Sequence, residues 1–209
     1  MPERQSSRKD AIRNREAVLA AADALFARHE SPEDVTMADV AAAAGVGKGT
    51  LFRAFGDRAG LLRALYEGRL EPIRQAVETG PRPLGPTTPP RERVPALLDA
   101  VLCFKLDNRR LALALEEGGS SSPYRAEHYE RWHSLLQAVL EEIPSVTDSG
   151  FTAHALLAAT RADLVEHLAG EERIPRERMR AQLSNFVTAV LAFRPTARTD
   201  RRGMIEKDQ

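Results

Sequence analysis

The residues that most often carry out enzymatic chemistry form no catalytic pattern in this sequence. No two histidines are four residues apart and no His-Glu-x-x-His motif occurs, so a helical zinc site lacks its first requirement. The adjacent pairs Glu116-Glu117 and Glu141-Glu142 point to different sides of a helix and are typical of solvated faces. No nucleophile elbow is present, and Gly118–Ser122 lacks the lysine of a phosphate-binding loop and is expected to be a flexible connection. The histidines to which the spacing argument applies are His29, His128, His133, His154 and His167. The sequence therefore predicts no metal and no cofactor.

The charged residues predict a local rather than a global nucleic-acid surface. Thirty Lys and Arg residues balance thirty Asp and Glu residues, so the chain has no overall positive field. The first 15 residues nevertheless form a basic arm with a net charge of +3, which contains Arg4, Arg8, Lys9, Arg13 and Arg15 against Glu3 and Asp10. Two interpretations stay open: a frayed, solvated terminus, or an arm that follows a DNA groove.

The composition predicts a soluble, all-α protein. Ala and Leu outnumber the β-branched residues, and their side chains lose little rotamer freedom in a helix. The single cysteine, Cys103, excludes an internal disulfide and lies in an apolar run, where it is expected to be a small buried residue. No apolar run of membrane-spanning length and no signal peptide are present, so we expect a cytoplasmic protein with no membrane partner.

Apolar periodicity predicts a chain of about nine helices. The first runs from about Asp10 to His29 and is followed by a break at Ser31–Asp34. Two short helices follow, and Asp57 caps a longer one that reaches about Glu78. The proline-rich segment 80–90 is expected to be an exposed loop, because proline removes a backbone donor. The remaining helices are expected at 91–106, 109–117, 124–143, 149–169 and 176–193.

The two short helices have the spacing of a helix-turn-helix. Thr36 is suited to cap the first helix, with Asp39 three residues on. Ala41 is small enough to let the helices cross closely, and Gly45 can adopt the positive φ that the turn requires. Leu51, together with Val46, fills the corner between the helices. An ordinary pair of antiparallel helices has the same spacing and stays open as an alternative.

The stretch Val35–Phe55 resembles the DNA-binding signature of the TetR family of transcriptional regulators. It reads VTMADVAAAAGVGKGTLFRAF, and the helix before it contains the sequence AADALF at residues 21–26. A charged cap at Asp57-Arg58 and the pair Leu61-Leu62 follow at the separation that the family shows. The resemblance covers about residues 11–66. It implies an N-terminal three-helix DNA-binding domain at 1–58, a C-terminal helical ligand-binding and dimerisation domain at 59–195, and a flexible tail at 196–209.

The resemblance also implies which residues contact double-stranded operator DNA. The second short helix would enter the major groove with Lys48 donating to guanine and Thr50 meeting a thymine methyl group or a phosphate. Gly47 and Gly49 would permit close approach of the backbone. Phosphates would be held at helix N-termini by Thr36 and Arg58.

Three departures from the family pattern bear on operator affinity. Phe52 stands where the family usually has Tyr, so a phenolic hydroxyl that would donate to a phosphate is missing. Ala54 removes a second backbone contact, which Arg53 could replace through a bidentate guanidinium. Gly47 stands where Ser is common, which weakens the cap of the recognition helix.

In the C-terminal part the resemblance implies a homodimer, with the last two helices pairing with their copies. Each of these helices, 149–169 and 176–193, is expected to carry one apolar stripe, and an intramolecular core is the alternative interpretation of the two stripes. Met179 and Phe193 lie on the stripe of the second helix. The candidate interface residues are Phe151, Ala155, Ala158, Ala162, Val165, Leu183, Phe186 and Val190.

Helices from 91 to 143 are expected to enclose an apolar pocket for a small-molecule effector of unknown identity. The candidate lining residues, for each of which plain core is the favoured alternative, are Leu102, Phe104, Leu113, Trp132, His133, Leu136 and Arg161. The effector is expected to tilt the helix Asp57–Glu78 and so to change the separation of two recognition helices. Together these features predict a ligand-responsive repressor. The alternatives are a degenerate helix-turn-helix protein that acts through protein partners and, least favoured, a helical enzyme.

Overall fold

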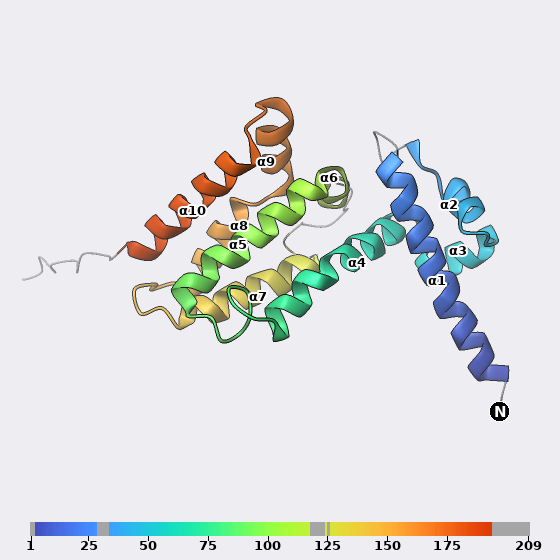
Figure 1. Cartoon of the computed structure of the whole chain (residues 1–209), viewed down its shortest axis with the longest axis horizontal. Coiled ribbons are helices and arrows are strands. Elements are labelled where there is room, and N and C mark those ends of the chain that lie inside the picture. Colours follow the sequence, from blue (N-terminus) through green and yellow to red (C-terminus); the bar gives the residue numbers. More distant parts are fainter. Residues whose placement is uncertain (1–2, 29–33, 118–123, 125, 194–209) are drawn as a thin grey trace, which may run out of the picture.

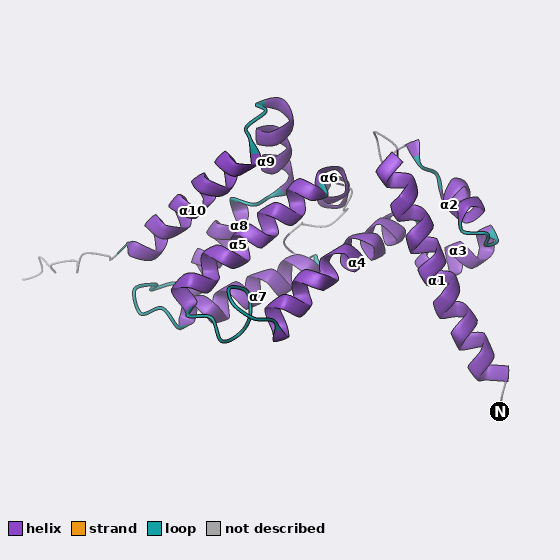
Figure 2. Cartoon of the chain, viewed as in Figure 1, coloured by secondary structure: helices purple, strands orange, loops and turns teal. Residues whose placement is uncertain are grey.

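The protein is built from helices, and the part of the chain that the structure describes contains no strand (Figures 1 and 2). This computed structural model describes residues 3–28, 34–117, 124 and 126–193 of the 209. The described helices form a small N-terminal group and a larger C-terminal bundle, and α4 joins the two (Figure 1). The all-α class predicted from composition is confirmed. The predicted connection Gly118–Ser122 and the predicted tail 196–209 lie outside the described residues.

The N-terminal group comprises α1 (Glu3–Arg28), α2 (Met37–Ala43) and α3 (Lys48–Phe55). Its small core contains Val18 and Ala22 of α1, Val40 and Ala41 of α2, and Leu51 of α3, none more than 3% exposed. Helix α1 begins seven residues earlier than the periodicity predicted. Apolar periodicity did not detect this first segment, and among residues 9–28, whose side chains are described, Val18 is the first of α1 in the core.

Helix α4 (Arg58–Thr79) connects the two groups because its side chains enter both cores. Leu61 packs in the N-terminal core, whereas Leu62, Leu65 and Leu70 pack in the C-terminal one. The Asp57 side chain accepts a hydrogen bond from the Gly60 amide at 2.7 Å, which confirms the predicted cap. We therefore expect a displacement of α4 in one core to affect the other.

The C-terminal bundle surrounds α5 (Pro90–Asp107), which contacts α4, α6, α7, α9 and α10. The other helices are α6 (Arg109–Glu117), α7 (Glu127–Glu141), α8 (Ser149–Ala158), α9 (Ala162–Glu166) and α10 (Arg176–Ala192). Leu97, Leu98, Leu136, Leu140 and Leu156 are fully buried at its centre. No helix among the described residues is long and apolar enough to cross a membrane.

The single helix expected at 149–169 is divided in the structure. Helix α8 ends at Ala158, a turn follows at 159–161, and α9 leads into the π-helical turn η3 (His167–Glu171). The fully buried Thr160 donates its hydroxyl to the carbonyl of Leu157 at 2.9 Å. A hydroxyl that bonds to a nearby carbonyl competes with the helical pattern, and hydrophobic periodicity does not register this competition.

The proline-rich segment before α5 is packed against the bundle rather than exposed throughout as predicted. Gly85 and Thr88 are buried, and Leu84 packs on the C-terminal core. The buried Arg93 guanidinium holds the segment by donating to the carbonyls of Leu84 and Val77, each at 2.9 Å. The prediction treated each proline only as a helix breaker and could not detect these tertiary hydrogen bonds.

Candidate functional site

The α2–turn–α3 unit has the local geometry that the sequence predicts for a helix-turn-helix. The Thr36 hydroxyl accepts from the Asp39 amide at 3.2 Å, and the Asp39 carboxylate accepts from the Thr36 amide at 3.0 Å. Gly45 has a φ of 64°, and the Val46 amide donates to the carbonyl of Ala41. The predicted cap and glycine turn are confirmed.

The N-terminal end of α3 is an open backbone surface. Gly47, Lys48 and Gly49 are exposed and Thr50 is half-buried. A Cβ atom added at Gly47 or Gly49 would meet nothing within 4 Å, and Gly47 caps the helix without a side-chain hydrogen bond. The first amides of α3 therefore keep donor capacity next to one lysine, an arrangement that suits a polyanion at close range.

The other predicted DNA contacts flank this end of α3. Phe52 is 47% exposed and Arg53 is exposed on α3, Thr36 is exposed at the start of α2, and Arg58 is half-buried at the start of α4. Sequence reasoning assigned Arg15 only to the basic arm. In the structure its guanidinium lies 4.7 Å from the centre of the Phe55 ring and donates to the carbonyl of Ala54 at 3.3 Å, so Arg15 braces α3.

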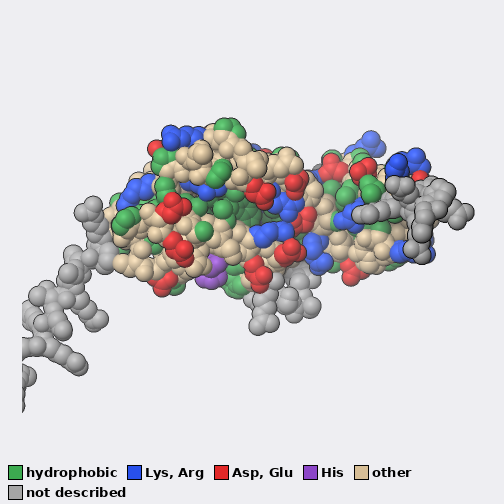
Figure 3. Space-filling model, turned by 90° about the horizontal axis from the view of Figure 1, so that it is seen from below, with side chains coloured by type: hydrophobic (Ala, Val, Ile, Leu, Met, Phe, Trp, Pro, Cys, Tyr) green, Lys and Arg blue, Asp and Glu red, His purple; other side chains and the backbone are tan. Residues whose placement is uncertain are grey.

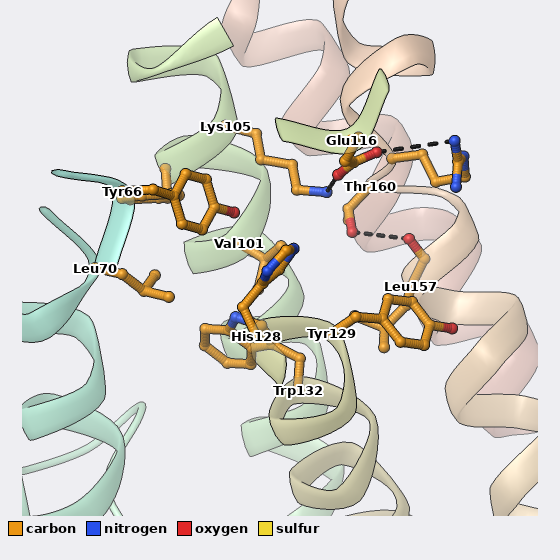
Figure 4. Close-up of a pocket in the computed structure, with 12 residues that line it drawn as sticks. Tyr66, Leu70, Val101, Lys105, Glu116, His128, Tyr129, Trp132, Leu157 and Thr160 are labelled. Atoms are coloured by element: carbon orange, nitrogen blue, oxygen red, sulfur yellow. Dashed lines mark hydrogen bonds and ion pairs between the residues drawn. The ribbon is translucent and has the colours of Figure 1, made fainter. Parts of the chain in front are cut away.

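A nearly closed pocket lies in the C-terminal bundle among α4, α5, α6, α7 and the α8–α9 turn (Figure 4). Its free volume is about 30 Å³, which holds about two water molecules. Three of the predicted lining residues are part of it: Phe104, Trp132 and Arg161. The others that line it are Tyr66, Leu70, Val101, Lys105, Glu116, His128, Tyr129, Leu157 and Thr160.

The pocket contains a buried ion pair. The Lys105 ammonium lies 2.6 Å from a Glu116 oxygen, and each side chain is only 10% exposed. The second Glu116 oxygen accepts from the Ala162 amide at 2.9 Å and lies 3.9 Å from Arg161. Burial lowers the pKa of Lys105, and the neighbouring Glu116 carboxylate opposes that change.

Tyr66 and His128 supply further polar groups to the same pocket. The Tyr66 ring packs edge-on against Phe104, with centroids 4.9 Å apart, and lies 5.2 Å from the His128 ring. Burial raises the pKa of Tyr66 above its usual value and lowers the pKa of His128, so both side chains are neutral near pH 7. Within the described residues, neither side chain has a hydrogen-bond partner in the protein.

A groove between α4 and α7 adjoins this pocket and has a free volume of about 410 Å³, within the range of ligand sites. Leu70, His128 and Trp132 line both spaces, so these three side chains form the wall between them. Figure 3 looks onto the side of the molecule where Figure 1 draws α4 and α7, and it shows a recess with hydrophobic side chains beside charged ones. The groove and the pocket together make a site that is open at one end.

Four predicted lining residues lie outside this pocket. Leu102 and Leu136 are buried in the core, and Leu113 is half-buried. His133 bonds to the carbonyl of Gly150 at 3.1 Å and packs on His154, with ring centroids 3.8 Å apart. Although His133 and His154 lie close together, the described residues hold no group of three or more side chains that could bind a metal ion.

Sequence reasoning missed most of the polar lining. Tyr66 lies in the predicted helix Asp57–Glu78 but was not singled out, and Glu116 was assigned to a solvated pair. One signal was available: Lys105 directly follows the apolar run 101–104 and precedes Leu106, so it is a charged residue on a buried helix. Such a residue requires a partner, but the sequence does not say which acid supplies it.

The predicted dimer face is exposed only in part. Phe151 is 72% exposed and Phe186 is 44% exposed, Ala158 is exposed, and Ala155 and Val190 are half-buried. Three of the candidates, Ala162, Val165 and Leu183, instead belong to the core of the protomer itself. An apolar groove with a free volume of about 290 Å³ separates the end of α8 from α10 and is lined by Ala159, Leu168, Met179, Phe186 and others.

The chain is similar to known regulators over its DNA-binding part and in its overall fold. Residues 18–65 match the family model of the bacterial regulatory proteins of the TetR family. An HTH-type transcriptional regulator of Staphylococcus aureus (strain MRSA252) is 25% identical over 177 residues, which cover 83% of this chain and 91% of the relative.

Two solved structures show the same fold. A putative TetR-family transcriptional regulator from Rhodococcus sp. superposes with a TM-score of 0.64 at 23% identity, covering 86% of this chain and 99% of the other. NalD, the secondary repressor of the MexAB-OprM multidrug efflux pump in Pseudomonas aeruginosa, superposes with a TM-score of 0.55 at 17% identity, covering 87% and 97%. Residues 18–65 thus match the DNA-binding domain of the TetR family of transcriptional regulators, and the chain as a whole has the fold of solved structures from that family.

Proposed function

We propose that the chain is a repressor that binds operator DNA as a homodimer and is released from it by a small molecule. In this proposal residues 1–58 bind the DNA, and residues 59–195 bind the effector and form the dimer. The observation that carries it is the open N-terminal end of α3, where Lys48 stands between two glycines whose missing side chains leave the backbone accessible. A helix end of this shape fits the major groove, with Lys48 placed to donate to base edges.

A homodimer explains how one short recognition helix can bind DNA specifically. Two copies of α3 about one turn of DNA apart read two half-sites together. The exposed aromatic residues Phe151 and Phe186 support an interface formed by α8 and α10, because large exposed side chains of this type are enriched at protein contacts.

The DNA-binding proposal is tested by fluorescence anisotropy with DNA from the protein's own promoter region. Lys48→Ala and Thr50→Ala should each weaken specific binding by about 1–3 kcal/mol per half-site. Arg82→Ala removes one exposed positive charge from the segment before α5 and serves as the matched control, with operator affinity expected to stay unchanged. Equal affinity of wild type and Lys48→Ala for the operator would contradict the proposal.

The dimer is tested with a matched pair of aromatic substitutions. Phe186→Glu places a charge on the α10 face and should shift the protein to monomer in light-scattering chromatography. Phe52→Glu changes an equally exposed phenylalanine on α3, 47% against 44% exposed, and should leave the dimer intact while weakening operator binding. A dimer that survives Phe186→Glu, or a wild-type protein that is monomeric when concentrated, would refute the α8–α10 interface.

A further inference from the structure

The inner end of the pocket holds more free hydrogen-bond donors than acceptors. The Lys105 ammonium has three N–H groups, and one of them is directed to Glu116. The Tyr66 hydroxyl and the His128 ring each offer one further donor, and the described part of the chain provides neither with a partner. In Figure 4 the side chains of these three residues surround one space.

The one carboxylate that lines the pocket is already engaged. One oxygen of Glu116 accepts from Lys105, and the other accepts from the Ala162 amide. Arg161, at the pocket edge, is bound to Asp163 at 2.8 Å. A cationic ligand would therefore find no free carboxylate here, whereas an anionic ligand would find unfilled donors and a positive charge.

The adjoining groove suits an apolar body. Leu70, Val77, Trp132 and Leu135 form its apolar lining between α4 and α7, and the carboxylates of Glu78, Glu127 and Glu130 also line it. Two arginines stand along it, but their guanidinium groups are already paired: Arg74 and Arg131 bind the Glu67 carboxylate at 2.7 and 2.6 Å. Among the Lys and Arg side chains that line the pocket and the groove, Lys105 is thus the one whose free N–H groups lie beside the unpartnered side chains of Tyr66 and His128.

We propose that the effector is a monocarboxylate with an apolar body, whose carboxylate binds Lys105, Tyr66 and His128 while its body occupies the α4–α7 groove. This inference rests on the proposed function, because it names the chemical class of the effector for that same pocket. Leu70, His128 and Trp132 move apart to join the two spaces, since the inner pocket alone holds about two water molecules.

The chain carries a built-in reporter for this binding. Trp132 is the single tryptophan of the sequence and lines both the pocket and the groove. Three probes with the same phenylbutyl body are titrated against its fluorescence: 4-phenylbutanoate, 4-phenylbutanamide and 4-phenylbutylamine. The carboxylate should bind about tenfold more tightly than the amide, because hydrogen bonds to a charged acceptor are stronger than those to a neutral one.

Two tyrosine variants separate recognition from packing. Tyr66→Phe removes a hydroxyl that has no partner among the described residues, so it should preserve folding and weaken carboxylate binding by about tenfold. Tyr129→Phe is the control, because the Tyr129 hydroxyl bonds to His154 at 2.6 Å and points away from the inner pocket (Figure 4). The double variant Lys105→Met with Glu116→Gln removes the ion pair as a whole and should abolish the preference for the carboxylate over the amide.

The outcomes distinguish this inference from the proposed function. Tighter binding of the amine, equal binding of carboxylate and amide, or no saturable change with any probe overturns the carboxylate assignment. Operator binding is measured on the same preparations, and 4-phenylbutanoate should lower it in wild type but not in the double variant. A protein that binds its operator yet prefers the amine loses only the inference, whereas a protein that binds no operator DNA loses the proposed function.

Discussion

Gly49→Ala should raise the stability of the protein while lowering its affinity for DNA. An added Cβ at Gly49 would meet nothing within 4 Å, so the protomer accommodates it without strain. Alanine gains about 0.5–1 kcal/mol over glycine inside a helix, and the lower end applies in the first turn of α3. At the DNA, the same methyl group would occupy the space through which the backbone approaches the base pairs.

The expected loss of affinity follows from the two copies of α3 in a dimer. A cost of about 1 kcal/mol per half-site, at the low end for a disturbed base contact, doubles to about 2 kcal/mol for the dimer, or about 30-fold in Kd. Operator affinity is measured by anisotropy, and stability by urea denaturation. Gly68→Ala on the exposed side of α4 is the control, because its Cβ also meets nothing within 4 Å and should stabilise the protein without any change in affinity. Unchanged operator binding by Gly49→Ala would refute close approach of α3 to the groove.

Four further perturbations test the local energetics. Thr36→Ala should cost about 1 kcal/mol of unfolding free energy by removing the hydroxyl that accepts from the first turn of α2, and an unchanged thermal midpoint would contradict this. Lys105→Met should cost about 3–5 kcal/mol of unfolding free energy, because it leaves Glu116 buried without its partner. The double variant Lys105→Met with Glu116→Gln should cost much less. Equal losses of unfolding free energy for the two variants in urea denaturation would refute the ion-pair argument. Wild-type stability should fall as the pH drops below the ordinary His pKa of 6.5, because burial lowers the folded-state pKa of His128 and the unfolded chain then binds more protons. His128→Gln should lack that fall in stability. Parallel pH profiles of the wild type and the variant would contradict this expectation. Glu171 and Glu172 raise the pKa of His167, so the stability that His167 contributes is present at low pH and is lost as the pH rises. His167→Gln should therefore remove this loss from the pH profile of the unfolding free energy.

The sequence predicted those features that depend on local backbone chemistry. The Thr36 cap, the Gly45 turn and the Asp57 cap each depend on a few consecutive residues, and each has the predicted geometry. Apolar periodicity located most of the helices for the same reason, because burial of one helix face leaves a regular pattern. The division of α8 from α9 was missed because it depends on the hydroxyl of Thr160 rather than on hydrophobicity.

The polar lining of the candidate effector pocket could not be predicted from the sequence, because its polar groups come from distant parts of the chain. Tyr66, Lys105 and Glu116 come from α4, α5 and α6, and only the tertiary fold brings them together. The sequence pattern could identify apolar faces, but it could not distinguish Phe104, which lines the pocket, from Leu102, which is packed in the core. A charged residue such as Lys105 within an apolar helix marks a buried site without revealing its partner.

The position of the pocket on α4 gives a physical route from effector to DNA. Tyr66 and Leu70 face the pocket, and between them Arg69 bonds to Asp23 of α1 at 2.7 Å and to Asn108, at the corner between α5 and α6, at 2.6 Å. A single turn of α4 therefore carries the pocket wall and the link between the DNA-binding helices and the bundle. An effector that joins the inner pocket to the α4–α7 groove must separate Leu70, on this turn, from His128 and Trp132. Because Leu61 of the same helix is buried in the N-terminal core, we expect the displacement to reach α3 through packing. In the proposed dimer, the effector would favour the separation of the two recognition helices that its pocket requires.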